Sequence, residues 1–204
     1  MKNTINKIIE TQTIDEFSIE QQKEICEKYS LYNVEGDWYS DFLDEYKETM
    51  PKYFEDVEIY FSGFHSQGDG ACFDAKINFN ELIKAIPKVT LHGKTKNAII
   101  KYNNDFGVDY EANISKYTTR YCHEKTRYFH FAIYSNRDNK KFIDKLINIQ
   151  DEINGYFEQL RLDISKDIYS KLQKEYEERT SFKELKEYFE ANETFFNVET
   201  LDME

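Results

Sequence analysis

The strongest constraint on the fold is an apolar stripe that continues through the last third of the chain. Its members recur at offsets of 4, 3, 4, 4, 3, 4 and 4, the period of a nearly straight α-helix. They are Phe142, Leu146, Ile149, Ile153, Phe157, Leu160, Ile164 and Ile168. A helix of roughly 40 residues is about 60 Å long, which exceeds the dimensions of a compact domain of this size. Part of the stripe must therefore pack against an N-terminal helix of this chain or against a second copy of it, as in a homodimer.

Two shorter helices are predicted near the N-terminus. Apolar residues recur at roughly helical spacing in residues 15–32, which begin with acidic side chains. In residues 37–50 large aromatic side chains recur every four residues, and Pro51 ends the pattern. The first quarter of the chain is therefore expected to be helical.

Three further helical segments are predicted outside these regions. Two of them are short and cover residues 80–87 and 95–104. The last helix begins after Thr180 or Ser181 as a possible N-cap, and Glu184 stands at the position that completes a capping box after Ser181.

Between these helices the apolar pattern changes to a period of two, which is typical of β-strands. Residues 57–64 and 71–79 are predicted to form antiparallel neighbours joined by the loop HSQGDG. Residues 109–119 and 127–135 are predicted to form a second strand pair, with the tip RYCHEKT at residues 120–126 between them.

These patterns predict an α+β fold, with a small antiparallel sheet built from two hairpins, N-terminal helices and a long C-terminal helical arm. A single domain is expected over residues 1–204, because no Pro/Gly/Ser-rich linker interrupts it. The helical N-terminal part would cover residues 1–52, the sheet-bearing core 53–136, and the long helix with the acidic C-terminal helix 137–204. A hydrophobic content of 40% with 16% aromatic residues argues against disorder.

The formal net charge of −12 is concentrated in two segments. Residues 35–58 carry nine acidic residues against two lysines, and residues 174–204 carry ten against four basic residues. A field of this sign repels phosphate backbones, which argues against direct nucleic-acid binding and leaves either a basic protein partner or a merely solvated surface. The candidate partner-binding residues are Asp37, Asp41, Asp44, Glu45, Glu48, Glu184, Glu187 and Glu190.

Neither a membrane segment nor a targeting signal is predicted. No run reaches the roughly 18 apolar residues of a membrane span, and residues 1–17 lack the apolar region of a signal peptide. Cys26, Cys72 and Cys122 are odd in number and form no CxxC pair, so neither a disulfide framework nor a zinc knuckle is expected. These observations predict a cytoplasmic protein with reduced thiols.

A glycine-rich stretch connects the first two predicted strands. Gly68 and Gly70 flank Asp69, and Ser66 and Gln67 come directly before them. Because a positive φ is cheap only for glycine, this loop could turn its amides toward an anion. It could equally close a turn in which Asp69 hydrogen-bonds to nearby amides.

The second tip carries Tyr121, His123 and Glu124, which are residue types that hold ligands or perform acid–base chemistry. If the two hairpins share one sheet, both tips can lie at the same edge. Cys72 would then be a candidate nucleophile and His123 its base. Asp69 or Glu124 would orient the imidazole. No HxxxH or HxH pair fixes a metal site, and no metal or cofactor is expected.

The run GDGACF, residues 68–73, resembles the DGxC nucleophile segment of ovarian-tumour-type cysteine proteases. In those proteases the cysteine opens a helix, whereas here a strand pattern follows it. The structural context therefore differs from that of the proteases.

A longer resemblance begins with IYFSGFHSQGDGACF, residues 59–73. The chain resembles a family of small phage and prophage proteins with the motif F-S-G-F-W-S-Q-G-D-G-A-[SC]-F, a preceding acidic segment containing Trp, a later tip Y-x-H-E-x-T and an acidic EANE helix. His65 replaces the usual tryptophan, and Cys72 stands where serine also occurs. The matching positions are Trp38, Phe61 to Phe64, Ser66 to Ala71, Phe73, Tyr121, His123, Glu124, Thr126 and Glu190 to Glu193.

This resemblance implies an accessory protein that acts on host machinery, including an immune system such as CRISPR. Together with the charge pattern it predicts a phage-derived inhibitor in the host bacterial cytoplasm that binds a basic protein such as a CRISPR effector. An acidic protein of this kind competes with nucleic acid and associates rapidly at low salt. The alternative is a ligand-binding or hydrolytic site formed by the SQGDGAC and YCHEKT loops.

Overall fold

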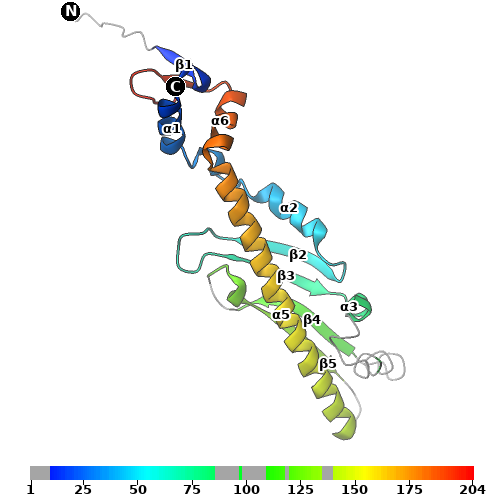
Figure 1. Cartoon of the computed structure of the whole chain (residues 1–204). Coiled ribbons are helices and arrows are strands. Elements are labelled where there is room, and N and C mark those ends of the chain that lie inside the picture. Colours follow the sequence, from blue (N-terminus) through cyan, green and yellow to red (C-terminus); the bar gives the residue numbers. More distant parts are fainter. Residues whose placement is uncertain (1–9, 86–96, 98–108, 118–119, 135–139) are drawn as a thin grey trace, which may run out of the picture. The chain divides into compact units, whose positions relative to one another are not determined.

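The computed structural model of this chain describes residues 10–85, 97, 109–117, 120–134 and 140–204. The helix predicted over residues 95–104 therefore lies almost entirely outside the described residues. The described part has the predicted α+β fold (Figure 1). Its contacts divide the chain into two compact units, residues 1–40 with 172–204 and residues 41–171.

The first unit brings together both ends of the described chain. β1 (Thr11–Thr13) pairs antiparallel with β6 (Phe195–Asn197), and α1 (Ile19–Lys28) packs beside α6 (Phe182–Ala191). Two short 3₁₀ turns, Ile14–Glu16 and Tyr32–Val34, flank α1. The buried core of this unit consists of Ile14, Phe17, Ile25, Cys26, Leu185, Phe189, Phe196 and Leu201.

The last helix of the chain begins where its capping residue predicts. Ser181 Oγ accepts a hydrogen bond from the backbone N–H of Glu184 at 3.3 Å. The hydroxyl thereby satisfies one of the amides that the first turn of a helix leaves unpaired. Of the two predicted candidates, Thr180 and Ser181, the N-cap is Ser181.

The second unit contains the sheet that both predicted hairpins share. β2 (Phe54–Phe61), β3 (Ala71–Ile77), β4 (Asp109–Lys116) and β5 (Arg127–Tyr134) lie in that order, and every neighbouring pair is antiparallel. α3 (Phe79–Ala85) follows β3, and the 3₁₀ turn Glu124–Thr126 precedes β5.

The faces of the sheet follow directly from the period of two. In β3 the side chains of Phe73, Ala75 and Ile77 are buried and apolar. They alternate with Asp74 and Lys76, which point to the opposite face. An apolar face of this kind needs a covering layer.

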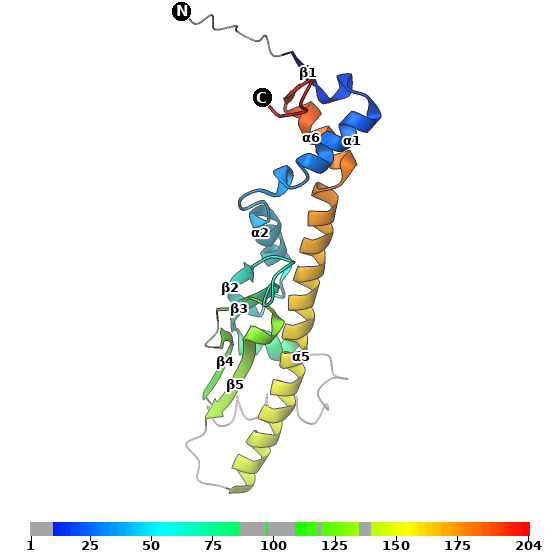
Figure 2. The same ribbon diagram turned by 90° about the vertical axis from the view of Figure 1, so that its left-hand side faces the viewer.

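α5 (Lys140–Arg179) supplies that layer, and its 40 residues confirm the predicted length. Within the second unit, Figures 1 and 2 show it running along one face of the sheet. The Phe157 ring lies 5.1 Å from that of Phe129 in β5 and 6.4 Å from that of Tyr53. Around Phe157, the prediction that the stripe packs against another helix is wrong. The stripe packs there against the apolar face of the sheet, which also needed a covering layer.

α2 (Ser40–Thr49) packs against a later part of α5. The Tyr46 hydroxyl donates a hydrogen bond to Asp167 at 2.6 Å, and Lys171 Nζ lies 5.0 Å from the centre of the Tyr46 ring. Burial, with this hydrogen bond, raises the pKa of Tyr46 above its ordinary value. Within the second unit, α2 and the sheet thus follow one another along the same side of α5 (Figure 2).

Candidate functional site

The two loop tips that the sequence singles out meet at one end of the sheet. The first tip, residues 62–70, ends where β3 begins, and the second tip, residues 120–126, follows the end of β4. Since β3 and β4 are antiparallel neighbours, with Ala75 opposite Ile114, the start of one strand lies beside the end of the other. The prediction that both tips share an edge is confirmed.

Glycines make the contact between the tips possible. The Cys122 N–H donates to the Gly68 carbonyl at 3.4 Å. A Cβ on Gly68 would lie 2.2 Å from Tyr121 Cδ1, and one on Gly70 would lie 2.6 Å from His123 Cβ. The tips therefore approach each other more closely than any residue with a side chain would allow at these two positions.

Asp69 closes the first tip on itself. Its carboxylate accepts hydrogen bonds from the backbone amides of His65 at 3.0 Å and Ser66 at 2.6 Å, and its own N–H donates to the Ser66 carbonyl at 3.0 Å. These amides precede Asp69 by three and four residues. In the expected turn, the carboxylate would instead accept from amides that follow Asp69. The two preceding amides are occupied by the loop's own carboxylate, while Ser66 and Gln67 lie exposed beside them.

The second tip is held both by its own imidazole and by a side chain of α5. His123 Nδ1 accepts the N–H of Lys125 at 3.2 Å, so the imidazole caps the 3₁₀ turn that follows. The backbone carbonyl of Glu124 accepts a hydrogen bond from Arg161 of α5. Tyr121 is the more open residue, with 37% of its surface exposed and the Arg120 guanidinium 5.2 Å from the ring centre.

The environment of Cys72 does not suit a nucleophile. The side chain is completely buried, with Thr126 Oγ1 3.8 Å from the sulfur. Burial raises the pKa of the thiol to about 12, and nearby Arg127 offsets this only in part. The thiol is therefore protonated at neutral pH, whereas a catalytic cysteine needs a thiolate. With His123 engaged as a cap, this pair lacks the arrangement of a cysteine hydrolase.

Two buried arginines that the sequence analysis missed hold the second tip in place. Arg127, 1% exposed, forms an ion pair with Asp74 of β3 and lies with its guanidinium 4.8 Å from the centre of the Tyr60 ring of β2. Arg127 also donates to the carbonyl and hydroxyl of Thr126, at 3.4 and 3.3 Å. One side chain thus connects three strands to the tip.

Arg161 connects the same tip to α5. It is 1% exposed, forms a two-point ion pair with Glu158 and donates to Glu124 of the tip. Glu158 also accepts the N–H of Phe129 at 2.9 Å, which satisfies an amide of the edge strand β5. Partial burial alone would raise the pKa of Glu158, but these hydrogen bonds outweigh it and hold the pKa below its ordinary value.

The signal for Arg161 was present in its spacing. It lies four residues after Phe157 and seven before Ile168, on the line that the helix buries. Apolar periodicity assigned Leu160 and Ile164 to that line instead, yet both are only half-buried. A count of apolar residues cannot detect a buried arginine.

The acidic residues of α2 are exposed and mostly unpaired. Asp44 forms an ion pair with Lys47 at 2.7 Å. Asp41, Glu45 and Glu48 are exposed, and none of them has a basic partner in the part of the chain that the structure describes. Before the helix, Asp37 is also exposed and accepts the Tyr39 hydroxyl at 3.5 Å.

The acidic residues of α6 differ in this respect. Lys183 Nζ lies 3.3 Å from a Glu184 oxygen and 3.5 Å from a Glu187 oxygen, and Lys186 pairs with Glu190. The lysines of the same helix thus neutralise these carboxylates locally. Of the predicted acidic surfaces, α2 presents the free negative charge.

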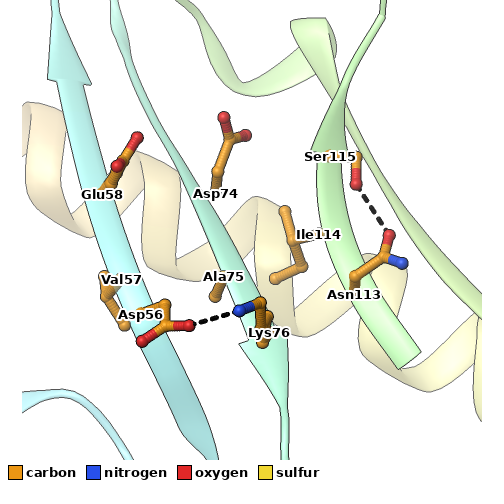
Figure 3. Close-up of a pocket in the computed structure, with 9 residues that line it drawn as sticks. All are labelled: Asp56, Val57, Glu58, Asp74, Ala75, Lys76, Asn113, Ile114 and Ser115. Carbon is orange, nitrogen blue, oxygen red and sulfur yellow. Dashed lines mark hydrogen bonds and ion pairs between the residues drawn. The ribbon is translucent and has the colours of Figure 1, made fainter. Parts of the chain in front are cut away.

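An open hollow of about 740 Å³ lies on the sheet face opposite α5 (Figure 3). The Lys76 ammonium pairs with Asp56 at 2.6 Å along one side of it, and the Ser115 hydroxyl donates to Asn113 Oδ1 at 2.7 Å on another. Glu58 and Asp74 stand directly opposite each other on neighbouring strands. The hollow is lined by Asp56, Val57, Glu58, Asp74, Ala75, Lys76, Asn113, Ile114 and Ser115.

Neither a cluster of metal-ligating side chains nor a membrane-spanning helix is present in the described part of the chain. No three His, Cys, Asp or Glu side chains among the described residues are grouped so that they could hold a metal ion. No helix among these residues is both long enough and apolar enough to cross a membrane.

Comparison with known proteins identifies one relationship. A family model described as a domain of unknown function (DUF8835) matches residues 14–181. The matched range contains both tips, α2 and the four-stranded sheet, and it ends just before α6. No curated protein and no solved structure matches the chain.

Proposed function

The chain belongs to the DUF8835 family, and we propose that it is a phage-derived, non-enzymatic inhibitor that binds a basic host protein through the acidic face of α2. The partner class is a nucleic-acid-handling protein of the bacterial cytoplasm, such as a CRISPR effector. The observation that supports this function is the free negative charge of Asp41, Glu45 and Glu48, which no described basic residue neutralises. The phage origin is supported by the sequence resemblance alone.

The spacing of these residues suits a surface for a basic partner. Positions 41, 45 and 48 are four and then three residues apart, so their side chains line one side of the helix over about 10 Å. The opposite side carries Leu43 and Tyr46, which are turned toward the rest of the unit. A row of carboxylates on a rigid helix can occupy a channel that otherwise holds phosphates.

The alternative, a ligand-binding or hydrolytic site at the tips, receives less support from the geometry. The Asp69 carboxylate is bonded to its own loop, and the His123 imidazole caps its own turn. Cys72 is buried with a raised pKa. These groups explain how two loops are held together, and they leave little chemistry for a substrate.

The test compares two charge-neutralised variants with the wild type. The first is Asp41→Asn/Glu45→Gln/Glu48→Gln in α2, and its matched control is Glu184→Gln/Glu187→Gln/Glu190→Gln in α6. Each removes three carboxylates while keeping side-chain size. We expect the α2 variant to bind the partner at least about tenfold more weakly, and the control to bind nearly as the wild type does.

Two measurements provide the readout. The partner is identified by affinity purification from host lysate, and inhibition is then measured as nucleic-acid binding or cleavage by that purified protein. Affinity should fall steeply with added salt, because the contact is electrostatic. Equal binding by both variants, or binding that does not respond to salt, would contradict the proposal.

A further inference from the structure

We propose that the hollow on the outer face of the sheet receives an arginine side chain of the basic partner, between Glu58 and Asp74. This inference rests on the proposed function and specifies a second contact for the same partner. The hollow lies in the same unit as α2 and directly follows it in the chain. The hollow lies on the face of the sheet opposite α5 (Figure 3).

Two carboxylates lie on adjacent strands at the hollow. Glu58 of β2 and Asp74 of β3 are direct partners in the ladder, and their side chains project from the same face (Figure 3). Like charges directly opposite each other destabilise a sheet. Arg127 already compensates Asp74 from within the protein, so a further cation in the hollow would compensate the second carboxylate, Glu58.

The charges around the hollow differ in how they are compensated. Asp56 is neutralised by Lys76, and Asp74 is neutralised from within the protein by the buried Arg127. Glu58 accepts the Tyr60 hydroxyl at 2.5 Å and has no basic partner among the described residues. The uncompensated charge of the hollow is therefore negative and is located at Glu58.

The size of the hollow and its hydrogen-bonding groups suit an arginine side chain. A volume of about 740 Å³ admits a long side chain with its aliphatic stem. Acceptors come from three strands: the carboxylates of Glu58 and Asp74, and the side-chain oxygens of Asn113 and Ser115 of β4. A planar guanidinium offers five donors, enough to reach several of these at once, whereas an ammonium offers three from a single point.

The probe is a short glycine-flanked peptide with one central arginine, and its control is the same peptide with citrulline, a neutral group of the same shape. Binding is followed by the amide resonances of the ¹⁵N-labelled full chain. We expect the arginine peptide to shift the resonances of Asp74, Asn113 and Ser115. The citrulline peptide should leave them in place.

Two variants locate the effect at the hollow. Glu58→Gln keeps an acceptor for the Tyr60 hydroxyl and removes only the charge, so we expect it to weaken peptide binding at least about fivefold. Glu55→Gln, on the same strand but outside the lining, keeps its acceptor for Asn78 and should bind as the wild type does. Absent shifts, or equal binding by the two variants, would overturn the inference.

The same variants separate this inference from the proposed function. Binding of the purified partner should weaken at least about fivefold in Glu58→Gln. If the partner is lost with the α2 variant but is bound equally by Glu58→Gln and the wild type, the arginine contact is wrong and the proposed function stands. If the α2 variant keeps full partner binding, it is the proposed function that fails.

Discussion

Tyr121 lies against Gly68 so closely that a Cβ on the glycine would be 2.2 Å from Tyr121 Cδ1. His123 stands in the same relation to Gly70, whose added Cβ would lie 2.6 Å from His123 Cβ and 2.9 Å from the backbone of the same residue. The two conspicuous sequence blocks are therefore two halves of one packing contact. Each glycine is required by a residue from the other loop.

The first prediction is that Gly68→Ala destabilises the protein. The added methyl meets the Tyr121 ring, and the residue has a φ of +94° that a side chain disfavours. We expect the free energy of unfolding to fall by roughly 1–3 kcal/mol in urea titrations.

Gly155 provides the matched control for this substitution. It lies within α5, and a Cβ there would meet nothing within 4 Å. Gly155→Ala should raise the free energy of unfolding by up to about 1 kcal/mol, because alanine is the better helix former. The same sign for both substitutions would contradict this account of the tips.

The second prediction concerns the buried ion pair beneath the tips. Arg127→Met removes the cation from Asp74 and the donors from Thr126. Because the Asp74 side chain keeps 29% exposure and some hydration, we expect a loss of about 2–3 kcal/mol, less than for a fully buried pair. Lys76→Met, which breaks the exposed pair with Asp56, should change the stability little. Thermal denaturation of both variants checks the difference.

The third prediction is a dependence of stability on pH that arises from Glu158. Its folded-state pKa lies below the ordinary value of 4.5, because Arg161 and the Phe129 amide favour the charged form. The ionised carboxylate therefore stabilises the fold at pH values above about 4.5, and this contribution is lost as the pH falls through the lowered pKa. The stability difference between wild type and Glu158→Gln should be constant near neutral pH and shrink in acid. A difference that grows on acidification would be inconsistent with this sign.

The fourth prediction concerns the thiols. Burial raises the pKa of Cys72 to about 12 and that of Cys26 to about 11, while Cys122 is only half-buried. In the folded protein at pH 8, iodoacetamide should modify Cys122 at least about tenfold faster than the other two. Peptide mass spectrometry assigns each site. Rapid labelling of Cys72 would revive the nucleophile hypothesis.

Local patterns in the sequence predicted much of the fold. The period of the stripe predicted a 40-residue helix, and alternation in residues 71–79 predicted β3. Even the meeting of the tips followed from placing two hairpins in one sheet. Each of these depends on near neighbours in the chain, whose side chains repeat with the geometry of the backbone.

The roles of the candidate residues could not be read in the same way. Asp69 and His123 are equally suited to a ligand and to a cap, and only coordinates show that each bonds to its own loop. The difference in ion pairing between the acidic residues of α2 and those of α6 is likewise visible only in the coordinates. Glu184 and Glu187 share Lys183, whereas Glu45 has no such partner among the described residues, although both helices carry many acidic residues.

The amino-acid sequence by itself determined the long helix, the four strands of the larger sheet, the resemblance to a glycine-rich motif and the uneven charge, because these depend on residues a few positions apart. The pairing of β1 with β6, which joins distant segments, was not predicted. Only the tertiary structure decided that the long helix covers the sheet and that Arg127 and Arg161 are buried. It also decided that Glu58 and Asp74 face each other across a hollow. These outcomes depend on which distant segments exclude water from one another, and a linear pattern does not record that.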